Sequence, residues 1–285
     1  MQIAERVYSL AQEQNDSALM IGAYGYLAAT LYFLGDFETA RQNALRGVRI
    51  WRSGAVHFPV EDWIAPVVHC LSNQVLSEWH LGEVAFCQTT MAEAISLASQ
   101  LHDTQASVYL LYWSAFLAYF EGDLAETERL ASDLIEMATR QNIATWLPHG
   151  RVLRGWTRSA SGDTAKGIAW IEDGIEDYRA AGAILATPFF LALKAQAFHL
   201  ANRACEALEA INEAEALVER SGARLWSAEL HRLRGMFLAA IGAEETQIEG
   251  SFCTAIRIAR EQKSVSLAKR AEESYAGYRQ QKRKR

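Results

Sequence analysis

The sequence predicts an all-α protein, a right-handed α-solenoid of about six helix pairs with a C-terminal capping helix. Half of its 285 residues are hydrophobic, and only four are proline, which leaves little material for irregular structure. Turn signals recur along the chain, first after 47 residues and then four times after 40, at Gly35, Gly82, Gly122, Gly162, Asn202 and Gly242. A fixed period of this length indicates a repeat array, because one helix pair cannot bury its apolar face alone.

Each turn separates the two helices of a pair. The first helices are expected at 17–34, 62–81, 104–121, 144–161, 185–201 and 224–241, and the second helices at 37–52, 84–101, 124–141, 164–181, 204–220 and 245–262. The seven extra residues of the first interval fit a loop at 51–61, which contains Pro59. A final helix at about 264–281 has no partner and is expected to cap the array.

Residues 3–14 correspond to the second helix of an incomplete pair. Ser9-Leu10-Ala11, followed by Asn15-Asp16, matches the pattern 87 residues later at 96–98 and 102–103, and 87 residues separate Gly35 from Gly122. We therefore interpret residues 1–285 as a single helical repeat domain that is a fragment of a larger protein. An orphaned first helix exposes apolar surface, so self-association through it is also expected.

Composition excludes several functional classes. The net charge of −6 argues against a general nucleic-acid binder. The four cysteines are scattered without a CxxC pair, so we expect no metal and no cofactor. No signal peptide is evident, and the apolar run 108–120 is too short to span a bilayer, which predicts a cytoplasmic protein.

The turn sequence resembles that of tetratricopeptide repeats, with glycine and then alanine five residues later, as in Gly35 and Ala40. A closer resemblance lies at 146–262, above all in the segment 226–235 (WSAELHRLRG). This region resembles the C-terminal repeats of bacterial class III adenylate/guanylate cyclase and STAND-type ATPase signalling proteins. The resemblance implies a non-catalytic regulatory module, since the cyclase and ATPase chemistry lies elsewhere in such proteins. The chain also lacks a GxxxxGK[ST] phosphate loop.

In tetratricopeptide arrays the first helix of each pair lines the concave face, which implies where a partner binds. Six aromatic residues form one stripe of helix 104–121, and five of them fall on that face. Rigid rings with polar tips suit a peptide or a small apolar ligand. The candidate binding residues are Tyr109, Tyr112, Phe116, Tyr119, Phe120, His149, Trp156, Trp79, His80 and Arg232.

The aromatic stripe, a line of arginines and the partner each have two interpretations. The alternative interpretation of the aromatic stripe is packed core, which is what aromatic stripes at helical spacing usually form. Arginines at 151, 154 and 158 form a line that could hold an anion or could be a solvated face paired with acidic residues at 172–177. The partner is a peptide or a domain, such as an upstream ATPase or cyclase module, and the alternative is a metabolite held near Tyr112, Phe116 and Trp156. Catalysis is not expected.

Overall fold

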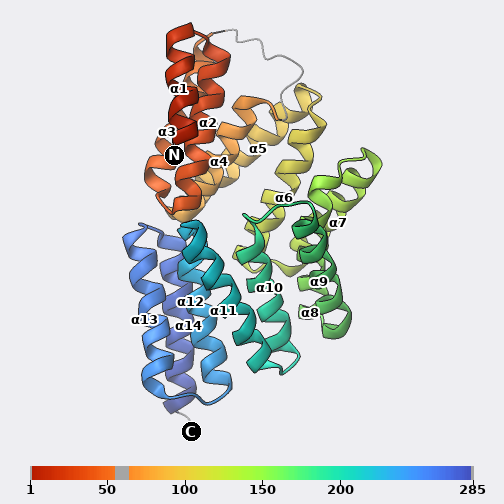
Figure 1. Cartoon of the computed structure of the whole chain (residues 1–285), viewed down its shortest axis with the longest axis vertical. Coiled ribbons are helices and arrows are strands. Elements are labelled where there is room, and N and C mark those ends of the chain that lie inside the picture. Colours follow the sequence, from red (N-terminus) through yellow and green to blue (C-terminus); the bar gives the residue numbers. More distant parts are fainter. Residues whose placement is uncertain (1, 55–63, 284–285) are drawn as a thin grey trace. The chain divides into compact units, whose positions relative to one another are not determined.

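The computed structural model describes residues 2–54 and 64–283, and most of the loop expected at 51–61 lies outside them (Figure 1). The described residues form helices joined by short turns and contain no strand. The helices are α1 (Gln2–Gln14), α2 (Ser17–Leu34), α3 (Phe37–Ser53), α4 (Pro66–His80), α5 (Val84–Gln100), α6 (Thr104–Glu121), α7 (Leu124–Arg140), α8 (Leu147–Ala160), α9 (Thr164–Ala180), α10 (Thr187–Leu200), α11 (Ala204–Ser221), α12 (Ser227–Ala240), α13 (Glu245–Glu261) and α14 (Val265–Arg283). The predicted helix pairs are thus confirmed, and the helix starts differ most at α4, which begins at Pro66 rather than at 62.

The turn within each pair is made by a residue in the left-handed conformation. All six predicted turn residues have positive φ, from 58° at Asn202 to 102° at Gly162. Such a residue ends a helix because its amide can turn back onto the last carbonyls. A second set of left-handed residues, between the pairs, was not predicted: Asn15, His102, Asn142, Gly182, Gly222 and Lys263.

Several first helices begin later than predicted. α4 begins at Pro66 rather than 62, and α10 begins at Thr187, next to Pro188. Proline suits the first helical turn, and it disfavours the helical conformation of the residue before it. Ala65, before Pro66, accordingly has a ψ of 121° and lies outside α4. The helices predicted to begin at 144 and 224 open with one 3₁₀ turn each, Ala144–Trp146 and Arg224–Trp226.

Contacts divide the chain into two compact units. Unit 1 comprises Met1–Trp113 with Gln262–Ser264, and unit 2 comprises Ser114–Glu261 with Val265–Arg285. The division falls within α6. That residues 1–285 behave as one domain stays a prediction.

Unit 1 contains α1 to α5 and the first part of α6. The helices of each pair pack together, α2 on α3 and α4 on α5, and α1 covers α2. α2 is long and apolar enough to cross a membrane. It packs against α1, α3 and α4 and buries Ile21, Ala28 and Tyr32, as the core helix of a globular unit does.

Unit 2 is built in two layers. The first helices α8, α10, α12 and α14 contact one another in sequence, and α9, α11 and α13 pack beside them as second helices. α8 and α9 approach closely at a pair of glycines, where a Cβ on Gly167 would lie 2.4 Å from the carbonyl oxygen of Gly155. This layer of first helices carries the site described below.

Candidate ligand-binding face

Four of the predicted binding residues lie in unit 1, and all four are buried: Trp79, His80, Tyr109 and Tyr112. The imidazole of His80 stacks on Phe37 with the ring centroids 3.7 Å apart. Its Nδ1 lies 3.0 Å from Ser264 Oγ, and its Nε2 lies 3.4 Å from the hydroxyl of Tyr32. Burial lowers the pKa of His80 to about 3, so the ring is neutral at pH 7.

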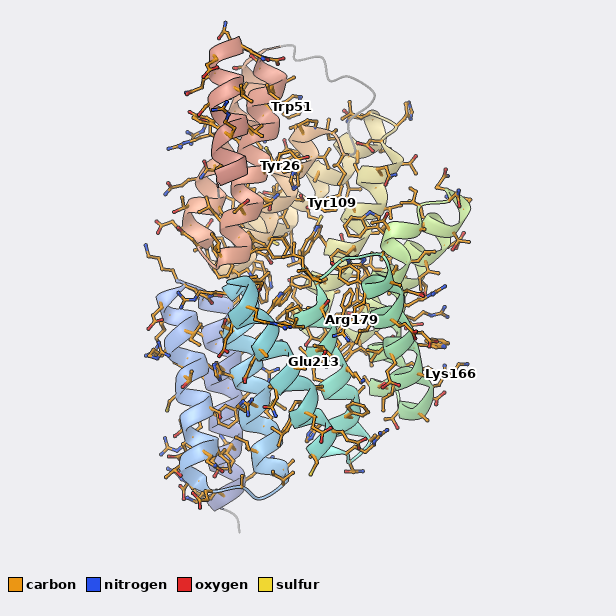
Figure 2. The ribbon with its side chains drawn as sticks, in the orientation of Figure 1. Tyr26, Trp51, Tyr109, Lys166, Arg179 and Glu213 are labelled. Carbon is orange, nitrogen blue, oxygen red and sulfur yellow. The ribbon has the colours of Figure 1, made fainter. Side chains whose placement is uncertain are left out.

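Tyr109 belongs to the same core. Ser72 donates a hydrogen bond to its hydroxyl at 3.3 Å, and its ring meets the edge of His69 at 6.0 Å. Burial raises the pKa of Tyr109 to about 12. In unit 1, therefore, the predicted residues pack as core, and a binding role for them stays a prediction. Tyr26, labelled in Figure 2, is an exposed ring of this unit, at 54% exposure.

The other part of the aromatic stripe lies in unit 2. Phe116, Tyr119 and Phe120 each contact Phe189 of α10, with ring centroids 5.1, 5.5 and 6.2 Å away. Phe189 in turn stacks on Trp226 at 4.9 Å. These five buried rings form one layer, which we call the aromatic layer.

His149, a further predicted residue, lies away from this layer. It is buried among Trp146, Tyr178 and Phe190, at ring distances of 4.7 to 5.3 Å. Burial lowers its pKa to about 3. In this structure His149 contacts the second helix of its pair, and a binding role for it stays a prediction.

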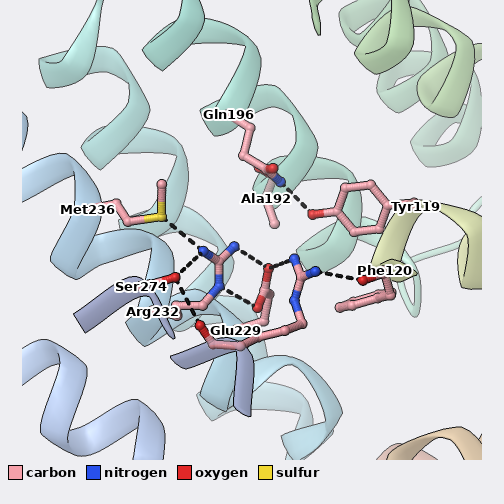
Figure 3. Close-up of polar contacts among 9 residues, drawn as sticks. Tyr119, Phe120, Ala192, Gln196, Glu229, Arg232, Met236 and Ser274 are labelled. Carbon is pink, nitrogen blue, oxygen red and sulfur yellow. Dashed lines mark hydrogen bonds and ion pairs between the residues drawn. The ribbon is translucent and has the colours of Figure 1, made fainter. Parts of the chain in front are cut away.

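Next to the aromatic layer, three charged side chains form an ionic cluster: the buried Glu229 and Arg232, both labelled in Figure 3, and Arg270, whose side chain is about a quarter exposed. Arg232 donates two hydrogen bonds to the Glu229 carboxylate, at 2.6 and 2.8 Å, and Arg270 donates a third at 3.2 Å. Although burial acts to raise the pKa of Glu229, the two guanidinium groups lower it to about 2.

The remaining contacts of the cluster join α12 to α14 and α6. Arg232 donates to Ser274 Oγ at 3.0 Å and lies 2.9 Å from the sulfur of Met236. Arg270 donates to the carbonyl oxygen of Phe120 at 2.6 Å and lies over its ring at 5.1 Å. The predicted residue Arg232 is therefore part of a larger network than the sequence indicated.

A row of partly buried side chains crosses the first helices next to the aromatic layer. It consists of Trp156, Gln196 and Met236, which occupy the same position in α8, α10 and α12 at intervals of 40 residues. The Trp156 ring meets Tyr119 at 4.8 Å, and Gln196 donates a hydrogen bond to the Tyr119 hydroxyl at 2.6 Å. Trp156 is thus the one predicted aromatic residue of unit 2 that the structure leaves partly open.

The line of arginines on α8 consists of ion-paired side chains. Arg151 pairs with Asp177, Arg154 with Glu128 at 3.1 Å, and Arg158 with Asp163 at 3.0 Å. All are about half exposed, which agrees with the solvated-face interpretation. Further ion pairs continue along α9 and α11, such as Arg179 with Glu213 at 2.5 Å (Figure 2).

Sequence reasoning missed Glu229 and Arg270, yet a signal for Glu229 exists. The repeat position that holds Tyr109, His149 and Phe189 in successive first helices holds Glu229 in the next. Glu229 thus places a carboxylate at a position where the other repeats have a ring. Such a carboxylate is expected to be buried and to need a positively charged partner nearby. Arg232 three residues later is the nearest candidate on a helix. The described residues hold no group of His, Cys, Asp and Glu side chains suited to a metal ion.

Comparisons with known proteins give the fold. No model of a known protein family matches the chain. A curated relative, an uncharacterized protein of Rhizobium meliloti (strain 1021), is 24% identical over 204 residues, which are 72% of this chain and 20% of the relative. The chain therefore spans about a fifth of that protein's length.

Two solved structures are similar over nearly their whole length. PlcR of Bacillus thuringiensis, in complex with the peptide PapR7 and DNA, has a TM-score of 0.57 at 14% identity and covers 88% of this chain and 98% of its own. The apo form of RapI has a TM-score of 0.56 at 12% identity and covers 92% and 98%. Both are tetratricopeptide-like helical repeat proteins, which confirms the predicted α-solenoid class.

Proposed function

We propose that the chain is a non-catalytic interaction and regulatory repeat module of a bacterial signalling ATPase or cyclase system. It binds a peptide or a partner domain on the first helices of unit 2. The observation that carries the proposal is the row of Trp156, Gln196 and Met236 next to the aromatic layer. The ATPase or cyclase context rests on the sequence resemblance at 146–262.

The physical basis is a buried, rigid aromatic layer that supports three side chains able to contact a partner. Tyr119 is buried and contacts both Trp156 and Gln196, so these two side chains are held in place before a partner binds. Binding therefore costs little further side-chain entropy at these residues. An aromatic ring, an amide and a thioether offer stacking, backbone hydrogen bonds and soft apolar contact. The complex of PlcR with PapR7 supports a peptide as the partner class for a related fold.

A synthetic array of random heptapeptides tests the proposal, with the purified chain as the probe. We expect a subset of peptides to bind the wild type and to lose most of their binding to Trp156→Ala. The matched control is Trp170→Ala on α9, which removes a tryptophan of similar exposure beneath Arg154 and Lys166. An array without binders, or equal losses in the two variants, would contradict the proposal.

A second candidate is a small-molecule sensor, which one cavity favours. A cavity of about 760 Å³ lies between the ends of α12, α13 and α14, with Phe252, Tyr278 and Met236 in its wall. This volume is within the range of ligand pockets. A metabolite that raises the melting temperature of the wild type but not of Tyr278→Ala would favour the sensor, and a full metabolite panel without such a shift would exclude it.

A further inference from the structure

Unit 1 contains a cavity that the described core side chains do not fill. It has a volume of about 230 Å³ and lies between α1, α2 and the start of α4. Its walls are mostly apolar and include Leu19, Ala23, Ile64 and Pro66. The volume corresponds to about seven molecules of liquid water. It is smaller than the pockets of about 300–1,000 Å³ that hold drug-sized ligands, so it suits a small compound.

A glycine in the second turn of α2, Gly22, leaves room for this cavity. A Cβ added at Gly22 would have one described neighbour within 4 Å, the Cβ of Pro66 at 4.0 Å. Crowding therefore does not demand glycine at this position, although glycine within a helix costs stability relative to alanine. Gly25 differs, because a Cβ there would lie 3.1 Å from Nδ1 of His69. The open space is thus specific to Gly22.

The carboxylate of Asp16 marks one end of the cavity. As the N-cap of α2, it accepts the backbone N–H groups of Ala18 and Leu19 on Oδ1, at 2.9 and 3.0 Å. Its second oxygen, Oδ2, has no bond to any other described residue. Among the described residues that line the cavity, Asp16 is the one with a charge. This end therefore favours a positively charged group.

His69 and Tyr26 mark the other end. A helix rises 1.5 Å per residue, so Tyr26 lies about 15 Å along α2 from Asp16. The ring of Tyr26 meets the edge of the His69 imidazole at 5.4 Å. Burial lowers the pKa of His69 to about 4, so its ring is neutral at pH 7. A neutral imidazole offers one donor and one acceptor nitrogen.

The ring nitrogens of His69 lack a hydrogen-bond partner among the described residues. His80 of the same unit differs, because both of its nitrogens have one. A polar group in an apolar cavity costs free energy unless water or a ligand forms hydrogen bonds to it. A ligand with a hydrogen-bonding group at this end of the cavity would remove that cost.

We propose that the cavity binds a small aromatic amine, with its ammonium group on Asp16, its ring over Gly22 and a hydroxyl group hydrogen-bonded to His69. A ring matches the apolar walls and can pack against the side chain of Tyr26. Its two polar groups lie at opposite ends, as the two polar ends of the cavity require. This site belongs to unit 1, and the inference does not depend on the peptide-binding face proposed for unit 2.

The first experiment uses three probes that differ by one group. Tyramine carries the ammonium group and the hydroxyl, phenethylamine lacks the hydroxyl, and para-ethylphenol lacks the amine. The imidazole signals of His69 in the isotope-labelled chain are followed by NMR during each titration. We expect tyramine to shift these signals and to bind at least about threefold more tightly than either other probe. Silence toward all three probes, or equal binding of tyramine and para-ethylphenol, would overturn the proposal.

Asp16→Asn tests the charge without removing the helix cap. Asparagine caps a helix about as well as aspartate, so α2 should keep its stability. Because an exposed ion pair contributes little, we expect tyramine to bind about three- to fivefold more weakly and para-ethylphenol to bind as before. The matched control is Asp36→Asn, the N-cap of α3, whose carboxylate accepts the N–H of Thr39 at 3.1 Å. Equal tyramine binding in the two variants would contradict a role for Asp16.

Gly22→Ala tests the cavity itself. The added methyl group takes up space that the ring needs, so all probes should bind at least about fivefold more weakly. The same change should raise the melting temperature, because alanine favours the helix. Weaker binding by a more stable chain is a combination that loss of structure cannot produce. The matched control is Gly250→Ala on α13, where a Cβ has no described neighbour within 4 Å. Unchanged binding in Gly22→Ala would place the probes outside this cavity and overturn the proposal.

Discussion

Each unit of the molecule buries a polar network, and the two networks differ in kind. In unit 1 the neutral ring of His80 lies between Tyr32 and Ser264, and both of its nitrogens have a partner. In unit 2 Glu229 holds two arginines, and one nitrogen of Arg270 remains without a partner. The first network is neutral and gives both ring nitrogens a partner, whereas the second carries an excess positive charge and one buried nitrogen without a partner.

The difference between the two networks reflects the free-energy cost of burying a neutral group and that of burying an ion. A neutral ring needs only its hydrogen bonds, because little hydration is lost when they are replaced. A buried ion needs both hydrogen bonds and opposite charge, because it loses far more hydration than a neutral group does. We place the binding function in unit 2 because the side chains of the row, Trp156, Gln196 and Met236, are partly exposed there, whereas the part of the stripe in unit 1 is buried.

The largest effect is expected for Arg232→Ala. It leaves the buried Glu229 carboxylate with only its weaker arginine, so the free energy of unfolding should fall by about 3–5 kcal/mol. Urea denaturation measures this. Replacing Glu229 and Arg232 together by leucine should recover most of the loss, because no buried charge is then left without its partner. If the double variant were as unstable as Arg232→Ala, the loss of stability would come from lost packing and not from the unpaired charge of Glu229.

His80→Ala is the matching change in the network of unit 1. It removes a ring stacked on Phe37, the partner of the Tyr32 hydroxyl and one of the contacts of Ser264, whose hydroxyl keeps its bond to the carbonyl oxygen of residue 80. We expect a loss of about 2–4 kcal/mol, from the cavity and the unsatisfied groups together. Binding of this variant to the peptides of the heptapeptide array should equal that of the wild type. A loss of binding in this variant would place the binding face in unit 1 and contradict the comparison.

The sequence predicted the helix pairs and the turns because both depend on local signals that repeat every 40 residues. It could not tell which side of a first helix is open. Phe116 and Trp156 occupy equivalent positions, yet Phe116 is 1% exposed and Trp156 is only partly buried. That difference arises from neighbours distant in sequence, such as Phe189 and Trp226 beside Phe116. Arg270 was missed for the same reason, since its partner Glu229 lies 41 residues earlier.

The pH dependence of stability separates the two networks. His80 has a pKa of about 3 in the folded chain against 6.5 in the unfolded one, so below pH 6.5 the unfolded state takes up a proton that the folded state does not. Its contribution to stability is complete above pH 6.5 and declines by about 1.4 kcal/mol per pH unit below it. The contribution of Glu229, with a pKa of about 2, is complete above pH 4.5 and is lost only below it.

Between pH 6.5 and 5, therefore, histidine titration decides the slope. His69 and His149, whose pKa values burial lowers to about 4 and about 3, add to it in the same direction. Urea denaturation across this range should give a shallower slope for His80→Gln than for the wild type. Glu229→Gln should leave the slope unchanged. A change of slope in Glu229→Gln would show that the ionic cluster titrates at higher pH than its charges imply.

The smallest effects are expected for two matched serines. Ser264, which is 1% exposed, partners His80, and Ser274, which is half exposed, partners Arg232. Ser264→Ala leaves a buried ring nitrogen unsatisfied and should cost about 1–3 kcal/mol. Ser274→Ala should change stability by no more than about 0.5 kcal/mol, because water can take the place of its hydroxyl. Equal costs for the two serines would mean that the hydroxyl of Ser274 is as hard for water to replace as that of Ser264.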